Sequence, residues 1–444
     1  MRRTTALGSA IAIALAVRLA HGPGALGYDA LWGLRWGDQI LHLHAPTFVA
    51  DTAPTPHPLV NLASALLMIL GTDAATTILL AVSWLSLGAL AVVLARLGAT
   101  LFSWPVGVLA AVAILTRSLL STETAQALTD LPFLALVVAA LDRELRRPRE
   151  GWTVPVLLVL AGLLRPEAWA LELVYLVYRR DVRVAALLAL APLLWAGLDL
   201  WATGDALHSL HGTRDLGVAL DRPRSTGTAL TLAPAALRDI IQQPLLWVAL
   251  AGALAGLLGR DRDSAVPGGI TVLGLAGYLV LGIAGLPLLG RYLLLPATML
   301  LLFAGLAVFG WVDARRHHRA WQLLGAAAAV TVLAGTPADV RKLRDARTFD
   351  RGYHAIQEDL RDATRAANRF GCARAVAPDH RSLAVVAAQR LGTRQTAGTA
   401  SFAAVDPARV AGFAIGAEGP QRFSPGARRV YRGDYWEAAI AACA

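Results

Sequence analysis

The sequence has little charge, almost no lysine and very little cysteine. Only 16% of its 444 residues are charged, whereas 56% are hydrophobic, which excludes an ordinary soluble globular protein. Its two cysteines, Cys372 and Cys443, are too few for a cysteine-rich metal site. They leave either one disulfide, if that region is exported, or two inert thiols. Lysine occurs once, at Lys342, and the dominance of Ala, Leu, Arg and Gly indicates a GC-rich bacterial genome.

Long apolar runs fill the chain from its N-terminus to about residue 336. A bilayer core about 30 Å thick needs roughly 20 apolar residues per helical crossing, so these runs predict membrane-spanning helices. The first run follows Arg2 and Arg3 and ends at Leu19. The later runs are 57–72, 74–96, 99–116, 124–142, 151–164, 167–178, 184–202, 244–259, 266–287, 292–311 and 320–336. We expect about eleven spanning helices.

Arginine clusters between the apolar runs indicate the orientation, because cytoplasmic loops carry the excess of Lys and Arg. After the N-terminal pair, clusters lie at 143–149, 179–183, 260–262 and 315–319, and all can face the cytoplasm together. This arrangement explains the net charge of +10 better than nucleic-acid binding does. We therefore expect a multi-pass protein of the bacterial plasma membrane with a cytoplasmic N-terminus, and an extracytoplasmic location for 22–56, 203–243 and everything after 337.

Four apolar runs lie between the outer loop 22–56 and the inner cluster 143–149. A chain that passes from the outside to the inside must cross the membrane an odd number of times, so one of these runs does not span. The runs 57–72, 99–116 and 124–142 are the candidates for the one that does not span. We expect that run to be a re-entrant or half-depth helix, which is tolerated where it is buried in protein or lines a cavity.

The pattern divides the chain into two units. Residues 1–336 form a transmembrane module whose first outer loop, 22–56, contains an amphipathic stretch, interpreted as a helix lying in the membrane interface or, alternatively, as an aromatic belt. Residues 337–444 combine a helical pattern over 353–370 with short β-like runs at 375–377 and 410–415. The predicted fold is mainly α, a polytopic transmembrane helical bundle with a small exported C-terminal α/β domain.

Ionisable groups at the border of apolar runs are costly, so each is a functional hypothesis. Those expected at the outer membrane level come from distant parts of the chain and are Asp29, Asp38, His57, Glu123, Asp130, Arg165, Glu167, Arg291 and Tyr292. A carboxylate can accept a proton from an attacking hydroxyl, and a guanidinium can hold a leaving phosphate. The alternatives are helix N-caps for Asp29 and Asp130 and a structural ion pair for Arg165 and Glu167.

Over residues 1–310 the sequence resembles the GT-C superfamily of polytopic membrane glycosyltransferases. The resemblance depends on Asp29 soon after the first helix, Pro56-His57-Pro58-Leu59, Leu128-Thr129-Asp130-Leu131-Pro132-Phe133, Gly162-Leu163-Leu164-Arg165-Pro166-Glu167-Ala168 and Gly290-Arg291-Tyr292-Leu293-Leu294-Leu295-Pro296. It implies that Asp29 is the catalytic base, that Asp130 supports the site, and that Arg165, Glu167, Arg291, Tyr292 and His57 bind the donor. It also implies a polyprenyl-phosphate-linked sugar as donor, such as a mannose or arabinose carrier, and a glycan, lipid or protein acceptor of the cell envelope.

The acids of the first outer loop depart from that family's pattern. Many members have two adjacent acidic residues there, whereas Asp29 is followed by Ala30 and Leu31. The next acid, Asp38, would face nearly the opposite way on a continuous helix. This spacing argues against a tightly bound divalent metal, because hard cations need several oxygen ligands. We therefore expect no metal and no cofactor, with Asp38 and Glu123 as possible supporting residues.

Two other classes of protein are compatible with a polytopic chain. A transporter or lipid flippase of the cell envelope would also carry charges at membrane depth, but it usually shows symmetry between its halves, and no internal repeat is visible. A non-catalytic assembly protein would leave Asp29, Asp130 and Arg165 without a purpose. Of these two, the transporter or flippase is the main alternative to a glycosyltransferase.

Overall fold

A computed structural model describes residues 3–48, 55–259, 262–312, 317–372, 374–390, 396–399, 410–415 and 428–440. Its helices are α1 (Arg3–His21), α2 (Tyr28–Leu41), α3 (Pro58–Met68), α4 (Thr72–Leu101), α5 (Trp104–Leu115), α6 (Ser118–Ala125), α7 (Asp130–Arg146), α8 (Thr153–Leu164), α9 (Ala168–Arg179), α10 (Val182–Leu188), α11 (Leu190–Thr203), α12 (His208–Ala219), α13 (Thr226–Ile241), α14 (Leu245–Leu258), α15 (Arg262–Ile283), α16 (Leu294–Phe309), α17 (His318–Asn368) and α18 (His380–Gln389). Short 3-10 turns, η1 (Gly290–Leu293) and η2 (Gly310–Val312), flank α16. The strands are β1 (Arg374–Ala377), β2 (Thr396–Thr399), β3 (Val410–Ile415), β4 (Arg428–Arg432) and β5 (Trp436–Ile440).

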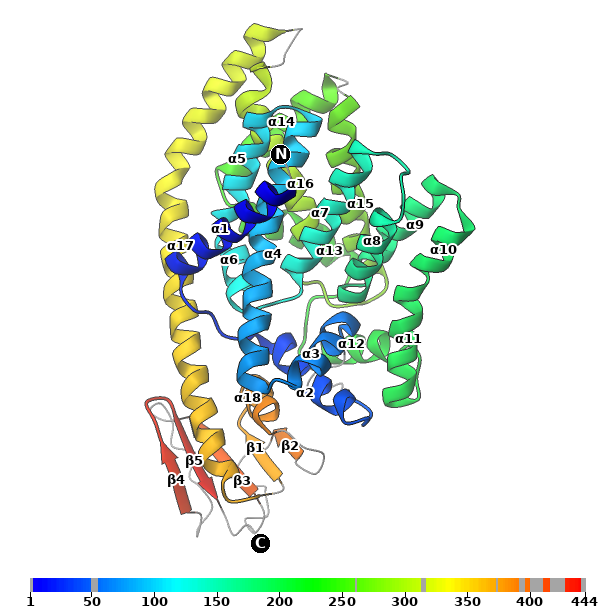
Figure 1. The fold of residues 1–444 in the computed structure, drawn as a ribbon. Coiled ribbons are helices and arrows are strands. Elements are labelled where there is room, and N and C mark those ends of the chain that lie inside the picture. The colour runs from blue at the N-terminus through cyan, green and yellow to red at the C-terminus, as the bar shows by residue number, and fades with distance from the viewer. Residues whose placement is uncertain are drawn as a thin grey trace.

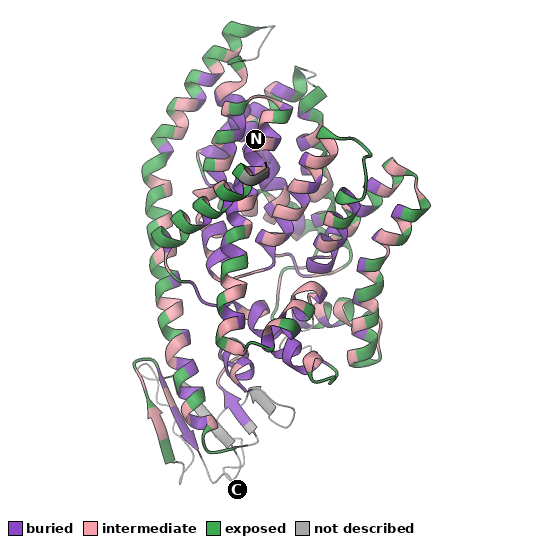
Figure 2. Ribbon diagram, in the orientation of Figure 1, coloured by how far each residue is buried: buried purple, intermediate pink, exposed green. Residues whose placement is uncertain are grey.

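The centre of the molecule is a helical bundle around α16, which is apolar on all sides and buried along nearly its whole length (Figure 2). Neighbouring helices approach one another at small residues, as is usual in membrane bundles. A Cβ on Gly107 of α5 would lie 2.0 Å from the carbonyl oxygen of Ala95 in α4, and one on Gly252 of α14 would lie 2.0 Å from that of Phe303 in α16. Glycine at these positions therefore allows the backbones to pack directly against each other.

The chain is a multi-pass membrane protein. Among the described residues, five helices are long and apolar enough to cross a bilayer, or up to seven if each of two bent helix pairs is one span. The expected count of about eleven is not confirmed. Of the three runs expected to include one that does not span, 57–72 contains only the short α3, and 99–116 ends in α5, which is bent by 61° against α6.

Arg117 connects two helix breaks and α17 in the middle of the bundle. Its side chain is 2% exposed and lies between α5 and α6. It donates to the carbonyl of Ile241, at the bend between α13 and α14, and to the carboxylate of Asp339 in α17. One buried guanidinium therefore satisfies a backbone carbonyl that a helix break leaves without a helical partner, and it pairs with a carboxylate of α17.

Helix α17 extends from the bundle into the C-terminal region (Figure 1) and passes without a break through residues 336 and 337, where we expected a domain boundary. Beyond it lies a five-stranded sheet in the order β2-β1-β3-β5-β4, in which β1 is parallel to β2 and β3, and β5 is antiparallel to β3 and β4. Asp359 of α17 accepts hydrogen bonds from the backbone amides of Tyr435 (2.7 Å) and Trp436 (2.8 Å), which attaches the sheet to the helix. Cys372 is buried and disulfide-bonded, and the chain's other cysteine, Cys443, lies outside the described residues.

The predicted interfacial helix exists as α2, but it does not lie open in an interface. Trp32 and Trp36 are buried, and so are Arg35, Asp38 and Gln39 on the polar face. The polar face is covered because α18 packs against it, with the Arg35 guanidinium donating to the carbonyl of Arg390 at 2.6 Å. The helical spacing was predicted correctly, and the position of this helix at the membrane interface stays a prediction.

Candidate active site

The first part of the candidate site is an ion pair between Asp29 at the start of α2 and Arg291 in η1. Asp29 accepts a hydrogen bond of 2.9 Å from Arg291, although 262 residues separate the two. The segment before α2 is fixed by backbone bonds to the end of α6, from Ala25 to the Ala125 carbonyl at 2.9 Å and from Gly27 to the Gln126 carbonyl at 2.7 Å. These bonds hold Asp29 next to α6 and η1.

The second part is centred on Arg165, which is 5% exposed at the junction of α8 and α9. Its guanidinium donates to Asp130, the first residue of α7, and to Glu167 at 2.8 Å. It also lies over the ring of Tyr292, 5.2 Å from the ring centre. Because Tyr292 follows Arg291 in the chain, Arg165 and Arg291 belong to one cluster.

Glu123 and His57 complete the cluster. Glu123 in α6 is buried and interacts electrostatically with Arg291, Arg165 and Asp29, and its Oε2 has no hydrogen-bond partner among the described residues. His57, just before α3, lies 2.7 Å through Nδ1 from the Leu164 carbonyl. A carbonyl only accepts, so Nδ1 carries the proton and Nε2 is free to accept one.

The charges within the cluster set the protonation states outside the spanning helices. Burial raises the pKa of Asp29, but attraction to Arg291 and Arg165 outweighs it and holds that pKa below the ordinary aspartate value. Burial also raises the pKa of Glu167, and its contact with Arg165 brings the net direction below the usual value. Burial lowers the pKa of His57 in spite of nearby Asp29. At neutral pH the Asp29 and Glu167 carboxylates are therefore ionised, and the His57 imidazole is neutral.

The structure brings together eight of the residues singled out in the sequence, namely Asp29, His57, Glu123, Asp130, Arg165, Glu167, Arg291 and Tyr292. Asp38 is not among them, since it lies with Arg35 and His42 on the far side of α2. The N-cap alternatives are also wrong: Gly27 and Thr129 occupy the N-cap positions, and neither Asp29 nor Asp130 caps its helix.

Two nearby residues, Tyr28 and Arg222, are not singled out by the sequence pattern. Tyr28 precedes Asp29, and its hydroxyl is buried beside the Trp32 side chain. Burial raises its pKa above the ordinary tyrosine value, while the positive charge of Arg222 acts in the other direction. A single tyrosine in an outer loop carries no spacing signal, because tyrosine is common at membrane borders for other reasons. In the described part of the chain, no three His, Cys, Asp or Glu side chains are grouped so as to hold a metal ion.

No known protein-family profile matches the chain, and no curated protein matches it. Its structure is similar to that of the Archaeoglobus fulgidus oligosaccharyltransferase tethered with an acceptor peptide containing the NVT sequon (TM-score 0.54, 13% identity, covering 89% of this chain). The chain spans 63% of the length of that protein. It is also similar to ArnT from Cupriavidus metallidurans bound to undecaprenyl phosphate (TM-score 0.51, 13% identity, covering 98% of both chains). The chain therefore has a GT-C-like fold.

Proposed function

We propose that this protein is an inverting glycosyltransferase that moves a sugar from a polyprenyl-phosphate donor to a glycan, lipid or protein acceptor at the outer face of a bacterial plasma membrane. The single observation that carries the proposal is the Asp29–Arg291 pair at the centre of the cluster, at 2.9 Å. It combines a proton acceptor with a phosphate-binding cation in one place. The GT-C-like fold supports the same class of reaction.

In this mechanism the Asp29 carboxylate accepts the proton of an acceptor hydroxyl. The hydroxyl oxygen forms a bond to the anomeric carbon from the face opposite the leaving group, and the bond from that carbon to the phosphate oxygen breaks. Asp29 suits this role because its side chain remains 22% exposed, so that a substrate can reach it. Its pKa below the usual aspartate value keeps it ionised at neutral pH.

The leaving phosphate takes both electrons of the broken bond and needs a cation. Arg291 supplies it, because its Nε is buried and has no partner among the described residues, while Nη1 is bound to Asp29. A phosphate oxygen at Nε would satisfy that donor. Arg165 is engaged by Asp130 and Glu167, so in this proposal it mainly fixes the positions of Tyr292 and Arg291.

The test is transfer of label from polyprenyl-phosphate mannose or arabinose in membranes. We expect Asp29→Asn to lower the rate by about 10²- to 10⁴-fold, the usual effect of losing a general base. Asp38→Asn is the matched control, since it changes the same side chain on the same helix outside the cluster and should retain wild-type turnover per folded molecule. Wild-type turnover in Asp29→Asn would exclude Asp29 as the base.

The same assay separates the enzyme from a transporter or lipid flippase. An enzyme leaves label covalently attached to an acceptor after the carrier lipid has been extracted. Movement of the intact labelled lipid across the bilayer, with no labelled acceptor, would contradict the proposed transfer.

A further inference from the structure

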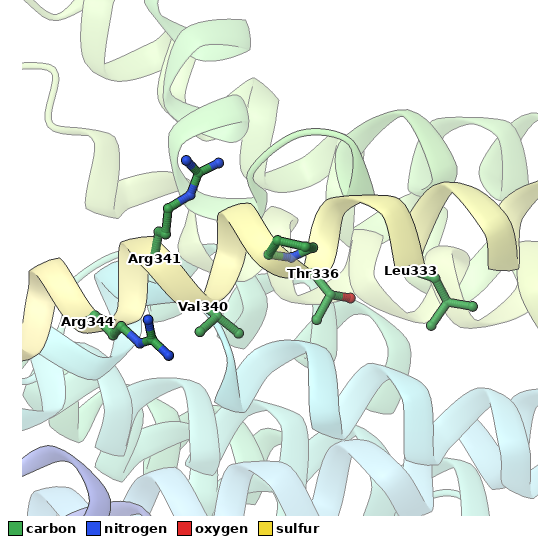
Figure 3. A pocket seen from close by; sticks show the side chains of 6 residues that line it. Leu333, Thr336, Val340, Arg341 and Arg344 are labelled. Carbon is green, nitrogen blue, oxygen red and sulfur yellow. The ribbon is translucent and has the colours of Figure 1, made fainter.

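Helix α17 carries a pocket of about 600 Å³ that the candidate site does not use (Figure 3). Its lining residues are Leu333, Thr336, Pro337, Val340, Arg341 and Arg344. Leu333, Thr336, Val340 and Arg344 recur every three or four residues and project to the same side of the helix in Figure 3, whereas Arg341 projects from the opposite side. The pocket is therefore an apolar strip with a guanidinium at one end and a second guanidinium beside it.

The pocket lies where α17 changes from apolar to charged. Residues 321–340 contain a single charged group, Asp339, whereas 341–347 contain Arg341, Lys342, Arg344, Asp345 and Arg347. In a spanning helix such a change marks the border between the acyl chains and the headgroups of the lipids. Leu333 is 71% exposed and Val340 is 39% exposed, so apolar side chains stay uncovered directly beside the cations.

Three acids lie on this part of α17. Asp345, next to Arg344, is exposed and forms no ion pair with a described residue, and the other two are used elsewhere. Asp339 binds Arg117, and Asp350 accepts hydrogen bonds from His21 and Thr122, on the side of α17 that faces α6. Among the described residues, neither Arg341 nor Arg344 forms an ion pair with a carboxylate. Two exposed guanidinium groups beside an apolar strip match a ligand that has an anionic phosphate at one end and hydrocarbon at the other.

We propose that this pocket binds an anionic phospholipid of the surrounding membrane, with its phosphate on Arg344 and the start of an acyl chain along Val340, Thr336 and Leu333, while Arg341 adds positive charge at the level of the headgroup. The proposal is independent of the sugar-transfer reaction, because no lining residue belongs to the Asp29–Arg291 cluster. The pocket adds a lipid contact where α17 leaves the bundle, on a different side of the helix from its contact with α6.

Native mass spectrometry of the purified full chain tests the site, with dioleoyl phosphatidylglycerol and dioleoyl phosphatidylcholine titrated separately. We expect Arg344→Gln to weaken the binding of phosphatidylglycerol about tenfold, the usual effect of losing one charge-assisted contact. Lys342→Gln removes the same charge two residues away, does not line the pocket, and should change that affinity less than twofold. Both residues are exposed, and size-exclusion profiles verify that the variants are folded.

Three results would overturn the proposal. The first is an unchanged phosphatidylglycerol affinity in the double variant Arg341→Gln/Arg344→Gln. The second is equal binding of phosphatidylcholine, which would show that the pocket does not discriminate by charge. The third is displacement of the phospholipid by inorganic phosphate or farnesyl phosphate at an equal concentration, which would assign the pocket to a soluble anion or to a carrier lipid.

Discussion

Arg291 has two roles at the scale of single residues, since it faces the proposed leaving phosphate and also lowers the pKa of Asp29. We expect Arg291→Gln to raise the KM for the donor. It should also move the acid limb of the pH profile of kcat/KM to higher pH, because loss of a neighbouring positive charge makes the Asp29 carboxylate easier to protonate. The measurement is kcat/KM between pH 4 and pH 8.

A shift of the acid limb to higher pH distinguishes a functional Asp29–Arg291 pair from an ion pair that only stabilises the structure. Wild-type activity should stay level down to about pH 5, because Asp29 remains ionised there. Arg224→Gln, on the loop before α13, is a charge-matched control and should leave the limb in place. If the acid limb of the pH profile also stays in place in Arg291→Gln, Arg291 does not control the pKa of the proposed base Asp29.

Gly24 tests how the position of Asp29 is fixed. It has φ +76, and a Cβ there would lie 2.3 Å from the carbonyl oxygen of Ala125, in the contact that holds the segment before α2 against α6. We expect Gly24→Ala to lower stability by more than about 1 kcal/mol and to reduce transfer further. Gly285→Ala has the same backbone strain, at φ +69, but nothing lies within 4 Å of its Cβ, so it should reduce stability less and leave transfer intact. Equal melting temperatures in detergent for both variants would contradict this account.

Most of the cluster could be predicted from the sequence, because an ionisable group beside an apolar run is costly and therefore conspicuous. Helical spacing also predicted that Asp38 would face away from Asp29. Tyr28 was missed because nothing in its local sequence distinguishes it from other aromatic residues at a membrane border. The pairing of Asp29 with Arg291 depends on packing across 262 residues, which no local pattern encodes.

At the scale of helices, Arg117 and Asp339 hold the breaks between α5 and α6 and between α13 and α14. We expect Arg117→Met to destabilise the protein by roughly 3–5 kcal/mol, because it leaves the Asp339 carboxylate partly buried without its partner. The double variant Arg117→Met/Asp339→Leu should recover part of that loss. Melting temperatures of the two single variants and the double variant complete the cycle. Strict additivity would show that the two side chains do not interact.

Apolar runs predicted most helices, but they did not predict where helices break or which loops are helical. The sequence pattern places residues 226–241 in an outer loop, yet they form α13, which bends by 109° into α14. Pro234 and scattered polar residues hide that helix from an apolar-run criterion. Burial of the polar face of α2 was not predicted, because the residue that Arg35 contacts, Arg390, lies more than 300 residues later. Local periodicity does not predict which polar groups are buried by segments that lie far away in the sequence.

At the scale of the whole molecule, the orientation of the chain remains a prediction that the arginine clusters and the disulfide at Cys372 both support. Disulfides persist in oxidising compartments, so a disulfide-bonded Cys372 agrees with an exported C-terminal region. It also offers a practical advantage, since a disulfide-bonded cysteine does not react with maleimides. A newly introduced cysteine would then be the main site of labelling.

Two variants, each with one added cysteine, decide the orientation. Asp434→Cys places an exposed thiol between β4 and β5, and Glu150→Cys places one in the arginine-rich loop between α7 and α8, where the side chain is 54% exposed. With a membrane-impermeant maleimide on intact spheroplasts, we expect labelling of Asp434→Cys at once and of Glu150→Cys only after permeabilisation. The reverse pattern would place the C-terminal region in the cytoplasm. Because α17 joins that region to the bundle without a break, it would also invert the side of the membrane on which the proposed transfer occurs.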